Sequence, residues 1–401
     1  MEKPSVAIPQ RSANGNLEAV REASLVRGGP FYRVQEAIHL LTAERWNLGR
    51  RMLLAICLGW VPLVLLTLFL KPDTTGELMK DYAVNFRLLI AVPILLAGQV
   101  MMDNVLRMTI AHIRDAELLP SPEQAKMDLT ISSLIRLRDS FVAEAVIVAI
   151  SYANVAGVIG SRLAIAQGWA LSDIGSGYHL SSAGWYYVLV SQLLYRFLLG
   201  ISLWKWCLWV YFLFRLSRLD LQLVPTHPDQ HGGVGFLGMS SFAIAPTVFA
   251  ICGAIGATWR TLILNHGAHL MNFKIDAFIL LVIMLIVAMG PLVLFVPKLG
   301  RLHRQGILQY GTLGQIHSVD FHKKWIVNRK GHEDEFLTAP EISTLIDYAS
   351  SYENVENLQP FPFHRGGMVV LVLAIVIPLL PVVLAEVPFV TVVKGLLSAV
   401  K

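Results

Sequence analysis

Long runs of apolar residues recur along the whole chain and limit what it can fold into. The first run, residues 52–70, contains no charged side chain. A helix rises about 1.5 Å per residue, so about 20 apolar residues cross the ~30 Å hydrocarbon core of a membrane. Charged residues make up only 15% of the chain, whereas soluble domains usually contain about 25%. These features predict an all-α, polytopic transmembrane helical bundle.

The apolar runs predict about seven membrane spans. They cover residues 52–70, 86–110, 141–163, 185–216, 236–264, 277–296 and the segment from 368 onward. The fourth span is longer than a bilayer is thick, so we expect it to tilt or to protrude. The last segment contains Pro378, Pro381 and Pro388. If these prolines make it re-entrant, the chain has six spans.

Basic residues predict the orientation of these spans. With a cytoplasmic N-terminus, the inner segments hold 23 Lys and Arg residues and the outer loops hold 4. Because cytoplasmic loops carry the excess of Lys and Arg, we expect the N-terminus inside. The chain then divides into an N-terminal cytoplasmic tail with an interfacial helix (1–50), a six-span bundle (51–297), a cytoplasmic loop (298–367) and a Pro-rich membrane segment (368–401).

Two short helices are expected outside the membrane. Residues 1–30 lack periodicity and predict a mobile tail, whereas Phe31 to Trp46 has one apolar face. That face predicts a helix lying on the membrane surface, with a helix packed on another loop as the alternative. In the 298–367 loop, Thr338 and Glu341 form a capping box before a short amphipathic helix. We expect this helix to lie beneath the bundle.

Ionisable residues inside the predicted spans are the first candidate site. They are Asp103, Glu144, Arg196 and Lys205. Buried charges cost several kcal/mol unless they are paired or hydrated, so they favour an ion path, a proton relay or a polar cavity. The alternative is a structural ion pair that fixes helix packing. Counted from the cytoplasmic ends, Lys205 lies at a depth similar to Asp103 and Glu144, so we expect it to meet one or both carboxylates.

Other residues of the predicted spans can extend this group of charges or set how closely the helices pack around it. Gln99, Asn154 and Gln192 can extend the same polar seam. The fifth span is rich in Gly and Ala, and its Gly253 and Ala257 form a small-xxx-small pair that lets helices approach closely. We expect a central, tightly packed helix there, with a pore-lining helix as the alternative.

The loop at residues 226–235 is the second candidate site, because it concentrates His, Asp and Gly at a membrane edge. His227, Asp229 and His231 alternate along the chain. Two imidazoles and a carboxylate are a weak candidate ligand set for zinc or another divalent cation. The alternative is a turn in which Asp229 accepts hydrogen bonds from the backbone.

The glycines of this loop suggest a different ligand. Gly232, Gly233 and Gly235 stand just before a predicted helix. Free N–H groups at a helix N-terminus hold phosphates and carboxylates, so the loop can bind an anion or a lipid headgroup. The negative charge of Asp229 opposes this, and tight chain entry into the fifth span is the alternative role of the glycines.

The run His-Pro-Asp-x-x-Gly-Gly-x-Gly-Phe, from His227 to Phe236, resembles a motif in a family of uncharacterised bacterial polytopic inner-membrane proteins. Residues 340–388, a short acidic helix followed by a Pro-rich apolar end, are similar to the C-terminal part of that family. The resemblance covers about the second half of the chain. It implies a location in the bacterial cell inner (plasma) membrane and no established activity. His231 falls on a variable position of the motif, which weakens the metal hypothesis.

Several classes of function are disfavoured by the sequence. Walker A, GxGxxG, HExxH and GxSxG motifs are absent, and the 298–367 loop is too short for a catalytic domain. We therefore expect no cofactor. The basic residues flank the membrane spans, so we expect membrane lipids and no nucleic acid as partners. A homo-oligomer and a partner protein stay open.

Three functional hypotheses remain. The leading one is a transport or channel protein for ions or a small solute that uses the intramembrane charges, with His227 and Asp229 as an inner gate or binding loop. The second is a membrane-embedded enzyme or binder that acts on lipid or polyprenyl-phosphate headgroups through the same loop. The third is a structural or regulatory subunit of a membrane complex.

Overall fold

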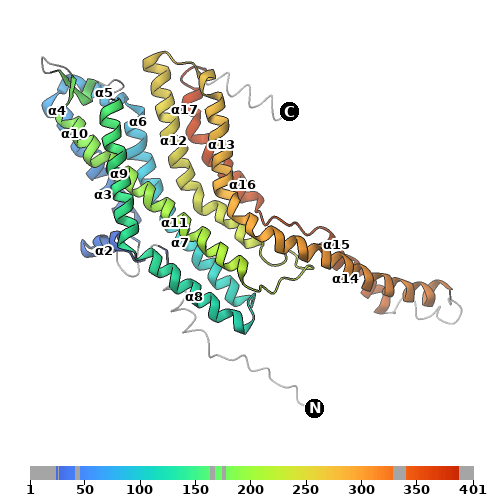
Figure 1. Cartoon of the computed structure of the whole chain (residues 1–401). Coiled ribbons are helices and arrows are strands. Elements are labelled where there is room, and N and C mark those ends of the chain that lie inside the picture. Colours follow the sequence, from blue (N-terminus) through green and yellow to red (C-terminus); the bar gives the residue numbers. More distant parts are fainter. Residues whose placement is uncertain are drawn as a thin grey trace.

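The structure is a computed structural model that describes residues 24–25, 27–40, 46–162, 168–173, 178–327 and 340–387. It shows a multi-pass membrane protein with an all-α bundle (Figure 1). Within these ranges, six helical stretches are long and apolar enough to cross a membrane. They are Leu48–Leu70, Tyr82–Asp115, Ser182–Arg218, Gly235–His266, Leu270–Val327 and Arg365–Val383. The remaining predicted span is α9 (Phe141–Arg162).

The first half of the chain forms one side of the bundle in Figure 1. Its helices are α2 (Pro30–Ala37), α3 (Leu48–Gly59), α4 (Val61–Leu70), η1 (Pro72–Thr74), α5 (Thr75–Lys80), α6 (Tyr82–Asn85), η2 (Phe86–Ala91), α7 (Val92–Asp115), α8 (Ser121–Arg138) and α9. After η4 (Gly168–Ala170), the strands β1 (Leu171–Asp173) and β2 (Tyr178–Leu180) pair antiparallel, with Leu171 opposite Leu180. These strands belong to the loop that precedes the fourth span.

The rest of the chain, from residue 182, completes this side with its first helices and then supplies the central helix and the other side. Its helices are α10 (Ser182–Tyr186), η5 (Tyr187–Ser191), α11 (Gln192–Arg218), η6 (Gly235–Met239), α12 (Ser240–His266), η7 (Leu270–Phe273), α13 (Lys274–Met289), η8 (Gly290–Phe295), α14 (Val296–His322), η9 (Lys323–Val327), α15 (Pro340–Glu356), α16 (Arg365–Val376), η11 (Ile377–Leu379) and α17 (Leu380–Val383). Buried Trp209, Phe212 and Phe295 belong to the main core.

Helix α12 packs against α7 on one side and α16 on the other. Small residues make both contacts close. A Cβ atom added to Gly98 of α7 would lie 2.8 Å from Cβ of Pro246 on α12, and one added to Gly367 of α16 would lie 3.1 Å from Cβ of Ser241 on α12. The Gly- and Ala-rich fifth span is therefore the central packed helix, as its composition predicts.

The last apolar segment runs along the whole of α12. At its start, Phe363 and His364 lie against Gly238, just before α12 begins. At its end, Glu386 accepts a hydrogen bond from the backbone N–H of Leu270, which follows α12 (2.5 Å). The segment therefore crosses from one end of the bundle to the other, and the re-entrant alternative does not apply to its described part. Residues 388–401 lie outside the described residues.

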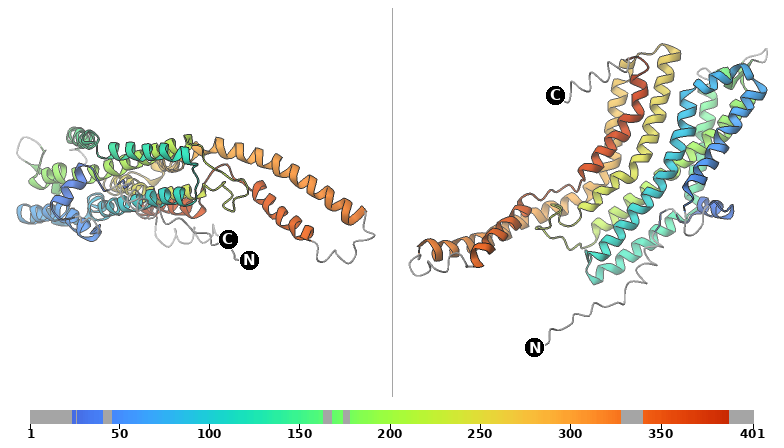
Figure 2. Two further views of the ribbon diagram at one scale, coloured as in Figure 1. Left: turned by 90° about the horizontal axis from the view of Figure 1, so that it is seen from below. Right: turned by 180° about the vertical axis from the view of Figure 1, so that it is seen from behind.

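Two predictions about the soluble parts need correction. Helix α15 does not lie beneath the bundle: it packs on α14, and the two form an arm that projects from the bundle (Figures 1 and 2). The sixth predicted span, α13, continues through η8 into α14 without an intervening loop. Helix α14 therefore extends the chain away from the bundle. The prediction of a mobile tail over residues 1–30 is wrong for Ser24 and Leu25, which are buried in the bundle, and its part over residues 1–23 lies outside the described residues.

The expected surface helix is likewise short. Helix α2 ends at Ala37, and residues 41–45 lie outside the described residues. Its Gln35 is buried against the bundle, whereas Val34 and Ile38 are exposed. We call the end of the bundle that holds α2, α8 and the arm the inner end, because its basic residues predict that it faces the cytoplasm.

Candidate functional site

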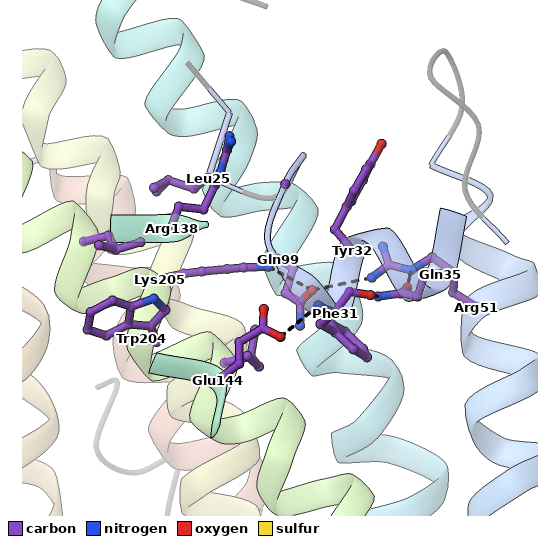
Figure 3. Close-up of a pocket in the computed structure, with 13 residues that line it drawn as sticks. Leu25, Phe31, Tyr32, Gln35, Arg51, Gln99, Arg138, Glu144, Trp204 and Lys205 are labelled. Carbon is purple, nitrogen blue, oxygen red and sulfur yellow. Dashed lines mark hydrogen bonds between the residues drawn. The ribbon is translucent and has the colours of Figure 1, made fainter. Parts of the chain in front are cut away.

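Three helices bring polar side chains together in the inner half of the bundle. Lys205 of α11 donates from Nζ to Oε1 of Gln99 on α7 at 3.1 Å, and Nη2 of Arg51 on α3 lies 3.5 Å from the same oxygen. Arg51, Gln99 and Lys205 are only 3%, 2% and 8% exposed. Two cations therefore share one neutral acceptor inside a membrane span (Figure 3).

A series of hydrogen bonds extends this group to Glu144. Nε of Arg51 donates to Oε1 of Gln35 (2.8 Å), and Nε2 of Gln35 donates to the carbonyl of Phe31 (3.2 Å). The backbone N–H of Phe31 then donates to Oε2 of Glu144 (2.8 Å). Glu144 thereby caps the N-terminus of α2, where unsatisfied N–H groups and the helix dipole favour negative charge. We call Arg51, Gln99, Lys205, Gln35 and Glu144 the inner cluster.

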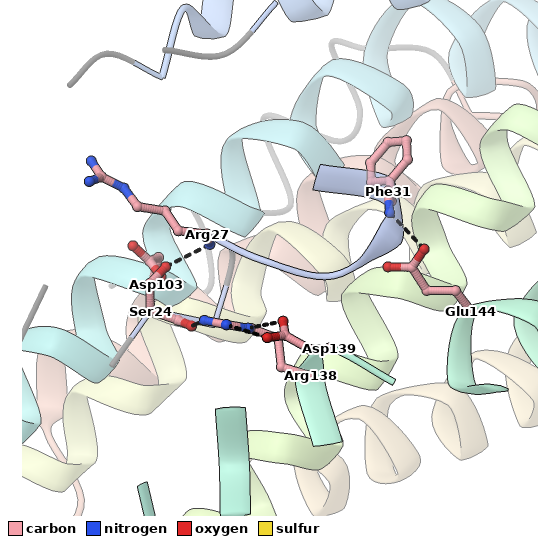
Figure 4. Close-up of polar contacts among 7 residues, drawn as sticks. All are labelled: Ser24, Arg27, Phe31, Asp103, Arg138, Asp139 and Glu144. Atoms are coloured by element: carbon pink, nitrogen blue, oxygen red, sulfur yellow. Dashed lines mark hydrogen bonds and ion pairs between the residues drawn. The ribbon is translucent and has the colours of Figure 1, made fainter. Parts of the chain in front are cut away.

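The N-terminal segment packs across Asp103, Arg138 and Glu144, next to the inner cluster (Figure 4). Arg138 forms two hydrogen bonds to Asp139 (2.8 and 2.9 Å) and also donates to the carbonyl of Ser24. Gly28 and Gly29 have φ angles of +140° and +82°, and a Cβ atom on Gly28 would lie 2.5 Å from Oδ1 of Asp139. Glycine is therefore needed for the segment to pass this close.

The inner cluster surrounds a small cavity of about 20 Å³. A cavity of this size holds about one water molecule. Its lining includes Leu25, Phe31, Tyr32, Gln35, Arg51, Gln99, Arg138, Glu144, Trp204 and Lys205 (Figure 3). The structure thus brings the predicted residues Lys205 and Glu144 to one cavity, and it adds Arg51, which lies in the first turn of α3 and was not a predicted site residue.

Asp103 and Arg196 lie elsewhere. Asp103 pairs with Arg107, one turn along its own helix, and accepts a hydrogen bond from Ser24 (2.5 Å). Lys205 contacts the amide of Gln99 instead. Among the ion pairs of the described residues it forms none with Asp103 or Glu144, contrary to the expectation that it meets one or both carboxylates. Arg196 lies on α11 between Gln192 and Lys205 and is not part of the cavity lining.

A second polar group, which we call the outer cluster, lies nearer the opposite end of the same helices. Arg87 of η2 donates to the hydroxyl of Tyr187 on η5 (3.1 Å) and to Oγ1 of Thr258 on α12 (3.0 Å). Gln192 donates to the same tyrosine hydroxyl. Both η2 and η5 are π-helical turns, a feature that is frequent at functional sites. The side chain of Asn154 lies outside the described residues.

The loop at residues 226–235 is organised around Asp229. Its carboxylate accepts hydrogen bonds from the backbone N–H groups of His231 (2.8 Å), Gly233 (3.1 Å) and Gly235 (2.9 Å). Nδ1 of His227 lies 2.7 Å from Oδ1 of Asp229. Burial raises the pKa of the Asp229 carboxyl, but these hydrogen bonds outweigh burial and hold the pKa below its usual value. Gly232 and Gly233 allow the turn through φ angles of +66° and +95°.

This geometry argues against both ligands considered for the loop, an anionic headgroup and a metal ion. The N–H groups of Gly233 and Gly235, which a headgroup would need, already bind Asp229. Nδ1 of His231 faces the carbonyl of Gln359 at 3.1 Å, away from a shared ligand. Among the described residues, no three His, Cys, Asp or Glu side chains are placed to hold a metal ion. His227, Asp229 and His231 therefore do not form the predicted metal set.

The same loop connects the arm to the bundle. The backbone N–H of Gln359, just after α15, donates to the carbonyl of Gln230 (2.7 Å). Nδ2 of Asn354 donates to the carbonyl of Thr226 (3.4 Å). A Cβ atom added to Gly306 of α14 would lie within 2.9 Å of Pro225. The loop is thus the joint at which both helices of the arm meet the membrane bundle.

Replacing Glu144 by alanine should loosen the N-terminal segment. The variant loses the carboxylate that caps α2, and loss of a cap costs about 1 kcal/mol. Amides 31–37 should therefore exchange with deuterium about fivefold faster. The measurement is hydrogen–deuterium exchange by mass spectrometry. Glu36→Ala removes an exposed glutamate of α2 and serves as the control; equal exchange in the two variants would contradict the capping role.

Comparisons of the chain with protein-family models, with curated proteins and with solved structures give no match, so its site is interpreted from its own geometry.

Proposed function

We propose that this multi-pass membrane protein transports an ion or a small solute, as a transporter or channel, across the bacterial inner membrane. The proposal rests on one observation. The two polar clusters lie one above the other along the same pair of helical segments, η2–α7 and η5–α11. Gln99 follows Arg87 by 12 residues, which corresponds to about 18 Å along a helix. Polar groups therefore recur at two depths of the membrane interior.

Placing ionisable side chains at two depths of the membrane interior costs free energy that an apolar interior would not require. Ionisable side chains in a span require hydration or partners, and they commonly mark the path of an ion or solute. Arg87 of the outer cluster and Arg51 and Lys205 of the inner cluster give the two clusters a cationic character. The π-helical turns at η2 and η5 leave the regular backbone pattern at the level of the outer cluster, as interrupted helices of transporters do.

The outer end offers an approach to this seam. An open groove of about 770 Å³ lies there, and its lining includes Tyr82, Asn85 and Arg260. Arg260 stacks over the ring of Tyr82, with 4.8 Å between the guanidinium carbon and the ring centroid. Asn85 precedes Arg87 by two residues. The groove lies at the outer end of the helices that carry both clusters, so a solute that enters it would be nearer to the outer cluster than to the inner cluster.

Proteoliposome swelling tests the proposal. Vesicles that contain the purified chain should swell faster than empty vesicles in at least one salt or solute of a panel. Lys205→Met should slow the rate about tenfold or more, because a charge that lowers the barrier by at least 1.4 kcal/mol is lost. Lys126→Met, an exposed lysine of α8, should leave the rate unchanged. Equal rates for Lys205→Met and the unaltered chain would refute the residue assignment, and rates equal to empty vesicles would refute transport.

A structural or regulatory subunit is the second candidate, and the arm favours it. Helices α14 and α15 project from the bundle, and they expose the apolar side chains of Leu308, Leu313, Ile316 and Ile346. Exposed apolar surface often marks a contact with another protein. Crosslinking from Leu308→Cys in intact membranes should then give one defined adduct. A ladder of unrelated adducts would count against this role.

A further inference from the structure

We propose that the inner cluster is a binding site for a small monovalent inorganic anion, which would occupy the cavity lined by Arg51, Gln99, Trp204 and Lys205. This inference deepens the proposed transport function by naming the class of its solute, and it rests on that function. Three independent features of the site support it: its unsatisfied donors, its charge and its size.

The first feature is a set of N–H donors with no acceptor. Within the described part of the chain, Nη1 of Arg51, Nε2 of Gln99 and Nε1 of Trp204 are buried and have no hydrogen-bond partner. All three residues line the same cavity. Every one of these groups can only donate. Leaving a buried donor unsatisfied costs about 1–3 kcal/mol, so an acceptor in the cavity would remove a large penalty.

The orientation of Gln99 follows from its neighbours. Its Oε1 faces both Lys205 and Arg51, so its amide nitrogen must point away from the two cations. Turning the amide over would place N–H groups against two positive charges. The donor of Gln99 is therefore available to a ligand and is not an arbitrary choice of amide orientation.

The second feature is the charge balance. Among the ion pairs of the described residues, none involves Arg51 or Lys205. Arg138 also lines the cavity, but its charge is balanced by two hydrogen bonds to Asp139. Glu144 supplies one negative charge against the two cations. With Arg51, Lys205 and Glu144 all ionised, one positive charge remains, which a monovalent anion would neutralise.

The third feature is the size of the cavity. Its volume of about 20 Å³ suits a particle the size of one water molecule. A halide ion has this size, whereas a phosphate ester, a lipid headgroup or a carboxylic acid does not. A water molecule would also fit the space, but it would leave the excess charge in place. Size and charge together point to a halide-like anion.

The test measures thermal unfolding of the purified full chain in detergent, in sodium chloride and in sodium gluconate at equal ionic strength. Chloride should raise the unfolding temperature until the effect saturates, because a ligand that binds only the folded state stabilises it. Gluconate is too large for the cavity and should give no saturable rise.

Two variants identify the site. Lys205→Met should raise the chloride concentration for half-saturation about tenfold or more, as expected when one charge-assisted contact is lost. Gln99→Glu places a carboxylate between the two cations. It should raise the unfolding temperature in gluconate and abolish the response to chloride, so it stays informative even if Lys205→Met fails to fold. Lys126→Met should respond as the unaltered chain does.

The outcomes separate the site from the transport function. Equal unfolding temperatures in chloride and gluconate would overturn the anion site, as would a chloride response that survives in Gln99→Glu. Swelling of vesicles without any chloride-specific stabilisation would leave transport standing and refute the site. Saturable stabilisation by chloride without any flux would support the site and refute transport.

Discussion

Replacing Asp229 by alanine should lower the free energy of unfolding by about 3 kcal/mol. The variant removes the acceptor of three backbone N–H groups, those of His231, Gly233 and Gly235. His231 and Gly233 are buried, so water does not readily replace the carboxylate. A buried donor left without its partner costs about 1–3 kcal/mol. Chemical unfolding in mixed micelles measures the change.

The same residue predicts how stability depends on pH. The pKa of Asp229 is lower in the folded protein than its ordinary value, so the folded state favours the carboxylate. Its contribution is full above the unfolded-state pKa of about 3.9 and is lost as pH falls through the folded-state pKa. The difference in stability between the unaltered chain and Asp229→Ala should therefore shrink under strongly acidic conditions.

Two further variants make this prediction specific. Asp229→Asn keeps one acceptor oxygen without the charge and should cost less than Asp229→Ala. Asp347→Ala changes an exposed aspartate on α15 and should alter stability by no more than about 0.5 kcal/mol. A loss for Asp229→Ala as small as that of Asp347→Ala would show that the loop does not depend on this carboxylate. Because the loop joins the arm to the bundle, the arm should become more protease-sensitive in Asp229→Ala.

Replacing Gly253 by alanine should also destabilise the protein, by about 2 kcal/mol. The added Cβ atom would lie 1.9 Å from Cζ of Phe86, far inside van der Waals contact. The ring of Phe86 is buried between Tyr82 and Phe249, with centroids 5.9 and 6.1 Å away, so it has little room to move. Overpacking of this kind costs about 1–3 kcal/mol. Arg87 follows Phe86 directly, so the outer cluster should shift and transport should slow.

Gly300→Ala is the matched control for this change. Gly300 also lies inside a helix, α14, but an added Cβ atom would meet nothing within 4 Å. Alanine favours the helix over glycine by about 0.5–1 kcal/mol, so this variant should be slightly more stable than the unaltered chain. The two variants thus have opposite expected signs in the same unfolding assay. A neutral or stabilising Gly253→Ala would mean that α12 and η2 are not in close contact.

Hydropathy was sufficient to find the membrane helices, because a bilayer imposes a minimum apolar length on every span. The first span was predicted at residues 52–70 and is seen at Leu48–Leu70. The central position of α12 also followed from composition, since Gly and Ala permit close approach. The arm was not predicted, because hydropathy identifies only apolar helices. The hydropathy of the chain falls after Phe295, whereas the helix continues to Val327.

Sequence patterns identified only some residues of the candidate site. Lys205 and Glu144 were singled out as charges inside apolar runs, and Gln99 as a part of the same seam. Arg51 was counted among basic residues before the first span, although α3 begins at Leu48 and carries it into the interior. Arg87 stood at the start of the second span, where a basic residue ordinarily faces the lipid headgroups.

The sequence by itself determined that this chain crosses a membrane several times, where most of its helices run and which of them is central. Only the tertiary structure decided which charges meet. Lys205 contacts Gln99, whereas Asp103 pairs with Arg107 and accepts a hydrogen bond from Ser24. The physical reason is that apolar length is a local property of the chain, whereas the partners of a buried charge depend on the rotation and packing of helices far apart in sequence.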